Sequence, residues 1–249
     1  MENSERVTPT EFGLKILQKL YPNIAPRAAP MQPHQTLLEE EKFSQQEIDD
    51  ILKNIPNGKA PGDDGIDNII VKVIFNSFLS LLLDFFNKFL ELKCFPDPME
   101  IRLVILFHKT GKDEQNNKSY RPISLLPTLG KLLEKLLLQR FNFRLKKKKL
   151  QHALQYGFRE GKSADDVLLH VTSLLEQARR QKKHTVLISL DIAGAFNSLL
   201  YSSIRDRFAS ISLFSNISET LLDTLRNRKV AMQTSEGRSS GNTRGCPQG

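Results

Sequence analysis

The segment His184–Asn197 constrains the fold of this chain more than any other. Its residues 185–190 are Thr, Val, Leu, Ile, Ser and Leu, a short apolar run that follows a basic cluster. Its length and β-branched residues predict a buried β-strand over Thr185–Asp191. An aspartate at the end of a buried strand is costly unless it is paired, hydrogen-bonded or bound to a cation. Asp191, with the small residues Ala193, Gly194 and Ala195 and the aromatic Phe196 shortly after it, therefore suits a metal-chelated nucleotide.

Taken alone, this pattern has a second interpretation. Asp191 also fits a turn or capping residue and Phe196 a core residue, and for an arbitrary strand this is the commoner arrangement. The functional interpretation therefore depends on what the rest of the chain supplies.

Composition limits the class of protein and favours one kind of partner. With 39% hydrophobic and 26% charged residues, the 249 residues are enough for one large or two modest globular domains. A formal net charge of +8 favours a polyanion, nucleic acid first. Two cysteines make neither a disulfide framework nor a zinc site. No signal peptide follows Met1, and the apolar run Val73–Leu83, bounded by charged residues, is too short to span a bilayer. We expect an intracellular protein, nuclear or cytoplasmic, without a membrane partner.

The order of helical and extended patterns predicts an α+β fold. Residues 1–42 are rich in proline and are expected to be a leader or linker before a domain at 43–249. Helices are predicted from capping boxes at Ser44 and Ser163, and from apolar spacing over 68–93 (with a break at residues 76–77), 129–145, 204–208 and 217–225. Besides 185–191, a strand is predicted over 102–109, and residues 120–127, with two prolines, are predicted to be extended. The polar residues 110–119 between them fit a connection or a hairpin tip, and a further hairpin is predicted over 230–243.

Six ordered segments resemble the reverse transcriptase domain of non-LTR (LINE-like) retrotransposons of arthropods. They are Gly58-Lys-Ala-Pro-Gly-Asp-Asp-Gly-Ile66, Ser119-Tyr-Arg-Pro-Ile-Ser-Leu-Leu-Pro127, Leu132-Leu-Glu-Lys-Leu136, Gln155-Tyr-Gly-Phe-Arg159, Leu190-Asp-Ile-Ala-Gly-Ala-Phe196 and Gly245-Cys-Pro-Gln-Gly249. The resemblance runs from about Phe43 to the last residue. It implies the fingers and part of the palm of a right-hand polymerase, helix-rich with a small antiparallel sheet. It also implies an RNA-directed DNA polymerase that adds dNTPs to a DNA primer on an RNA template.

The resemblance also implies roles for particular residues. Asp191 and the backbone carbonyl of Ile192 match ligands of two catalytic Mg²⁺ (or Mn²⁺) ions, hard cations that prefer oxygen. Lys109 and Arg121 match the residues that bind the incoming triphosphate, where the planar fork of arginine can donate two bonds to phosphate. Phe196 matches the aromatic residue that excludes a 2′-hydroxyl. Gln248 matches a residue that packs against the nucleotide. Without the resemblance, Lys109 equally fits a solvated cation at a strand end.

Nucleic-acid contacts are expected from a second group of basic residues. Arg159 matches a position that has either a structural role or a template contact. The run Lys146, Lys147, Lys148 and Lys149 fits an RNA contact or, equally, a solvated helix end favoured by the helix dipole.

One feature of the family is missing from the 249 residues. Two further catalytic carboxylates come from a Tyr-x-Asp-Asp hairpin that follows the Pro-Gln-Gly segment in the family, and no such motif occurs here. One carboxylate cannot hold two divalent ions against their mutual repulsion. We therefore expect a truncated chain without polymerase activity. The alternatives are a remnant that binds RNA or RNA–DNA duplex without chemistry, and an unstable pseudogene fragment.

Overall fold

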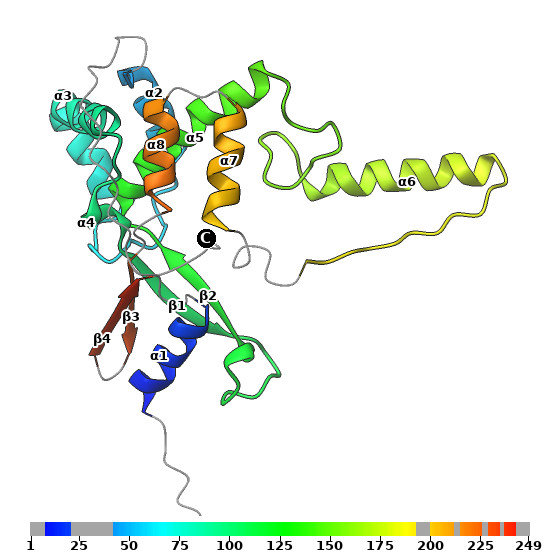
Figure 1. The fold of residues 1–249 in the computed structure, drawn as a ribbon, viewed down its shortest axis with the longest axis horizontal. Helices are drawn as coiled ribbons and strands as arrows, with labels where there is room; N and C mark the ends of the chain where they lie inside the picture. The colour runs from blue at the N-terminus through cyan, green and yellow to red at the C-terminus, as the bar shows by residue number, and fades with distance from the viewer. Residues whose placement is uncertain are drawn as a thin grey trace, which may run out of the picture. The chain divides into compact units, whose positions relative to one another are not determined.

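The computed structural model describes residues 8–20, 42–192, 200–211, 215–225, 229–234 and 237–242. Two compact units are distinguished, one of residues 1–141 with 194–249 and one of residues 142–193. The helices are α1 (Pro9–Leu20), α2 (Gln45–Asn54), α3 (Asn68–Leu92), α4 (Asp97–Glu100), α5 (Thr128–Lys147), α6 (Ala164–Arg180), α7 (Tyr201–Ile211) and α8 (Ser215–Asp223), with a 3₁₀ turn at Asn117–Ser119. The strands are β1 (Arg102–His108), β2 (Tyr120–Leu125), β3 (Lys229–Thr234) and β4 (Gly237–Asn242). The predicted α+β class is confirmed (Figure 1).

The four strands form one sheet in the order β2-β1-β3-β4. The β1–β2 and β3–β4 pairs are antiparallel, and the second pair confirms the hairpin predicted over 230–243, whereas β1 and β3 are parallel. The prediction of an antiparallel sheet is therefore wrong at the central pair, and the sheet is mixed. Parallel neighbours need a long crossover connection, and the segment from β1 to β3 supplies one that contains several helices.

One apolar core joins the helices of the first unit. Its fully buried side chains come from α2, α3, α5 and α8, and they are Ile48, Val71, Phe75, Phe86, Leu90, Leu132, Leu133, Leu136, Leu137 and Ile217. The two capping boxes predicted from the sequence are both formed, at Ser44 with Glu47 and at Ser163 with Asp166. Each box satisfies backbone N–H groups at a helix start and so fixes where α2 and α6 begin.

Helix α3 is interrupted next to the predicted break. Phe78 has non-helical φ and ψ of −137° and 40°, directly after Asn76–Ser77. The charged residues at both ends of the apolar run Val73–Leu83 do not end the helix, which is 25 residues long in total. By length and composition it is the one described helix that could cross a membrane. One of its faces, which includes Val71, Phe75 and Phe86, is instead buried in the core, while apolar residues on the other face are exposed.

The proposed leader contains a helix that packs against the sheet. In α1, Ile16 and Leu17 are buried, and Leu17 contacts a small apolar cluster that includes Val104, Val230 and Met232. Residues 1–42 are predicted to be a leader or linker, and within them Pro9–Leu20 forms a helix. The sequence Gly13-Leu-Lys-Ile-Leu17 holds three apolar residues, too short a pattern to stand out in a segment with five prolines.

Candidate nucleotide-binding site

Lys109 and Arg121 lie on one hairpin, and its register places them on the same face. Phe107 is directly opposite Arg121 across the antiparallel pair. The backbone N–H of Lys109 donates to the carbonyl of Ser119 at 2.7 Å, so the pairing continues one residue beyond β1. Residues directly opposite each other on paired strands lie on the same face of the sheet, and so do residues two apart on one strand. The side chains therefore share one face at Phe107, Arg121 and Lys109. Diagonal neighbours of this kind are about 7–8 Å apart at their backbones.

Both cations can reach a ligand from this face. Arg121 is exposed and Lys109 is half-buried. The ammonium of Lys109 donates one hydrogen bond to the carbonyl of Lys118 at 2.7 Å, which leaves two of its three N–H donors for a ligand. The hydroxyl of Tyr120 donates to the carbonyl of Glu114 at 3.0 Å and so ties the loop at the hairpin tip to the strand.

The same face carries exposed apolar side chains. Ile105 and Ile123 are cross-strand partners, and they and Phe107 are 37%, 41% and 51% exposed. A surface that combines exposed apolar groups with two cations suits a ligand with a flat apolar part and a phosphate chain. The two cations are among the residues predicted from the sequence, whereas these three apolar residues are not. Successive side chains of a strand point to opposite faces, so in Leu103-Val-Ile-Leu-Phe107 it is every second residue before Lys109 that shares its face, which includes Phe107 and Ile105.

Asp191 and Ile192 lie in the second unit, in a segment without helix or strand. The predicted buried strand at Thr185–Asp191 is wrong, because all of its residues are exposed, with Val186 at 83% and Leu190 at 89%. A strand is stabilised by ladder hydrogen bonds to a neighbour. Among the described residues, no strand pairs with this segment. Phe196 and Gln248 lie outside the described residues.

The second unit carries most of the net positive charge of the chain. Residues 142–193 hold eleven Lys and Arg residues against five Asp and Glu residues. Lys146 pairs with Glu160 at 2.6 Å, whereas Lys147 lies in the last turn of α5, and all four residues of the lysine run are exposed. The guanidinium of Arg159 donates to the carbonyl of His152 at 2.8 Å and thereby braces its own loop. The template contact expected for Arg159 stays a prediction.

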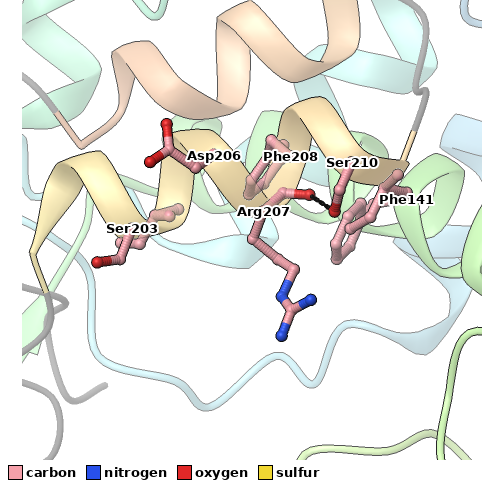
Figure 2. A pocket seen from close by; sticks show the side chains of 8 residues that line it. Phe141, Ser203, Asp206, Arg207, Phe208 and Ser210 are labelled. Carbon is pink, nitrogen blue, oxygen red and sulfur yellow. Dashed lines mark hydrogen bonds between the residues drawn. The ribbon is translucent and has the colours of Figure 1, made fainter.

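A cavity of about 610 Å³ lies on a different part of the first unit. Its wall is α7 with Phe141 of α5, whose ring stacks on that of Phe208 at 5.3 Å. Figure 2 shows these two rings together, and Ser210 bonded to the carbonyl of Arg207 at 2.7 Å. None of the predicted site residues lines this cavity.

Comparison with known proteins decides the family. The model of the family described as reverse transcriptase (RNA-dependent DNA polymerase) matches residues 108–249, more than half of the chain. The chain belongs to the reverse transcriptase family. The matched range contains Lys109, Arg121 and Asp191 and begins at the last residue of β1.

Relatives of the chain include proteins of mobile elements in Drosophila. The chain is 33% identical over 178 residues to the RNA-directed DNA polymerase from mobile element jockey of Drosophila melanogaster, which covers 70% of this chain and 19% of the relative. It is 29% identical over 222 residues to the RNA-directed DNA polymerase from mobile element jockey of Drosophila funebris, an alignment that covers 87% of this chain and 24% of the relative. It is also 29% identical over 214 residues to the putative 115 kDa protein in type-1 retrotransposable element R1DM of Drosophila melanogaster. That alignment covers 82% of this chain and 19% of the relative. The predicted resemblance to retrotransposon reverse transcriptases is confirmed. The chain spans about a fifth of the length of these relatives.

Reverse transcriptases use divalent metal ions, and the described residues fit such a centre only in part. Asp191 supplies a carboxylate and Ile192 a carbonyl, both oxygen donors suited to Mg²⁺. Among the described residues, however, no group of three His, Cys, Asp or Glu side chains is gathered to hold an ion. These residues alone therefore do not make a two-metal centre.

Proposed function

We propose that this chain forms the part of an RNA-directed DNA polymerase that binds the incoming nucleotide, with Lys109 and Arg121 holding the triphosphate of a dNTP. The observation that carries the proposal is the register of the β1–β2 hairpin, which puts both cations on one face beside exposed apolar residues. Two fixed cations neutralise the negative charge of a triphosphate and orient it, and the arginine can donate two bonds to one phosphate group.

The remaining roles follow from the family and complete the proposal. RNA is the template, a DNA strand is the primer, and residues 43–249 correspond to the fingers and the first part of the palm. Asp191 and the carbonyl of Ile192 contribute oxygen ligands for Mg²⁺ or Mn²⁺, which in reverse transcriptases lowers the barrier to attack by the primer 3′-hydroxyl. Phe196 and Gln248 are proposed as nucleotide contacts from their motifs. A polypeptide of these 249 residues should bind nucleotide without incorporating it, because it supplies one catalytic carboxylate of the three.

Binding of dATP with Mg²⁺, measured by equilibrium dialysis, tests this proposal. Lys109→Ala and Arg121→Ala should each weaken binding about ten- to a hundredfold, since a hydrogen bond to a charged group contributes about 1.5–3 kcal/mol. Arg121→Lys should restore part of the loss. Lys112→Ala is the matched control, because Lys112 is an exposed lysine at the tip of the same hairpin. Equal affinities in the wild type and both alanine variants would refute the proposal.

A second candidate function is RNA binding by the basic second unit. Its support is the excess of basic over acidic residues in 142–193. Affinity for a single-stranded RNA should then fall steeply with salt, because each phosphate contact releases a counterion. Affinity that does not change between low and high salt would exclude it.

A further inference from the structure

Three aromatic rings lie behind the two cations, on the opposite face of the hairpin. The rings of His108 and Tyr120 are 5.2 Å apart, and these residues are cross-strand partners. Each is the immediate sequence neighbour of one cation, His108 of Lys109 and Tyr120 of Arg121. The third ring is that of Phe12 in α1, which meets Tyr120 edge-on at 5.7 Å.

Helix α1 is itself held firmly against the sheet. Leu17, one and a half turns after Phe12, is 5% exposed and packs with Val104 of β1 and with Val230 and Met232 of β3. The helix thus contacts β2 at Tyr120, and β1 and β3 at Leu17. Figure 1 draws α1 beside the sheet. It precedes residues 108–249, so the part of the chain that matches the family does not include it.

We propose that α1 positions the triphosphate-binding cations, with Phe12 acting through Tyr120 on Arg121 and Lys109. Successive side chains of a strand point to opposite faces, so a ring fixed behind the sheet fixes the backbone from which the next side chain projects in front. Tyr120 is the centre of this arrangement, because it contacts Phe12 and His108 and also donates to the carbonyl of Glu114. Phe12 is therefore a positioning residue, and the inference rests on the proposed role of the two cations.

Without the ring of Phe12, the end of the β1–β2 hairpin that carries the two cations has more conformational freedom. The cations then spend less time in the geometry that binds both ends of a triphosphate, and affinity falls because binding must order them. The free energy of an edge-to-face aromatic pair corresponds to a loss in affinity of about three- to tenfold.

The test measures the affinity for dATP with Mg²⁺ in Phe12 variants of the whole chain. Phe12→Ala should weaken binding about three- to tenfold, and Phe12→Tyr, which keeps the ring, should restore it. Lys15→Ala, an exposed position on the same helix, is the matched control. Ile217→Val controls for stability alone, because Ile217 is buried in the helical core and should change affinity little. Amide exchange at residues 108–121 should rise in Phe12→Ala and not in Ile217→Val.

The outcomes separate this inference from the function on which it rests. If Lys109→Ala weakens binding and Phe12→Ala does not, the positioning role is wrong and the proposed function stands. If Lys109→Ala and Arg121→Ala leave affinity unchanged, the proposed function fails first. If Phe12→Ala does not fold, Phe12→Leu replaces it, since leucine keeps an apolar side chain and removes the ring edge. Full affinity in a folded Phe12→Leu chain would then overturn the inference.

Discussion

Glu100, the last residue of α4, should make the folded chain less stable as the pH rises. Its side chain is 3% exposed, and neither carboxylate oxygen has a hydrogen-bond partner among the described residues. Burial, then the nearby Asp223 and Asp97, raise the pKa of Glu100 to about 8, against the weaker opposing effect of Arg102 and Lys229. The folded protein therefore keeps this carboxyl protonated at neutral pH, whereas the unfolded chain ionises it.

The size of the effect follows from the two pKa values. Glu100 titrates near 4.5 in the unfolded chain and near 8 in the folded one. Because the folded state binds the extra proton, its contribution is fully present below pH 4.5 and is lost as the pH rises through the folded pKa of about 8. Between these limits the free energy of unfolding falls by about 1.4 kcal/mol per pH unit, or roughly 2–3 kcal/mol from pH 5.5 to 7.5. That is a large part of the stability of an ordinary domain.

Urea unfolding at pH 5.5, 6.5 and 7.5 measures this slope in the wild type and in Glu100→Gln. Glutamine has nearly the same shape and does not ionise, so the variant should lose the part of the slope that Glu100 causes and be the more stable chain at pH 7.5. Glu114→Gln, at an exposed position of the hairpin tip, is the control and should keep the slope of the wild type. Because the two chains differ only at Glu100, the difference between their slopes is the decisive quantity. Identical slopes in Glu100→Gln and the wild type would refute the reasoning.

Three further predictions concern packing, an ion pair and charge. Gly62→Ala should destabilise the chain by about 1–3 kcal/mol, because its Cβ would lie 2.4 Å from a backbone nitrogen, whereas Gly58→Ala meets open space; thermal unfolding compares the two. Arg140→Leu should cost about 1–3 kcal/mol in urea unfolding, because it removes a two-bond contact with Glu47. Burial acts to raise the pKa of Glu47, but the contacts with Arg140 and Ser44 together outweigh burial and lower it. The loss should therefore shrink as the pH falls below 4.5, and a constant loss would contradict this. Lys147→Ala should weaken RNA binding equally for all sequences and lower the salt dependence by about one phosphate contact, measured by fluorescence anisotropy.

Local signals in the sequence predicted the local structure well. The capping box at Ser44 depends on residues three apart, and it forms as expected. The two prolines after Tyr120 keep that segment extended, which allows β2 to form there. The register that unites Lys109 with Arg121 is also local, since the two strands are joined by a short connection.

The failures all involve partners distant in the sequence. Thr185–Asp191 has the composition of a strand, but pairing depends on a neighbour that composition does not identify. The parallel pair of β1 and β3 joins residues more than a hundred positions apart, and no local pattern specifies it. Phe12 meets Tyr120 across a similar interval, so its role was not visible in the sequence.

A double-mutant cycle on Lys109 and Arg121 tests the central claim most directly. The affinity for dATP with Mg²⁺ is measured for the wild type, Lys109→Ala, Arg121→Ala and the double variant. If both cations bind one triphosphate, the double variant should lose clearly less binding free energy than the sum of the single losses, with a coupling of about 0.5–3 kcal/mol. Strictly additive losses, or no loss in either single variant, would contradict a shared triphosphate site.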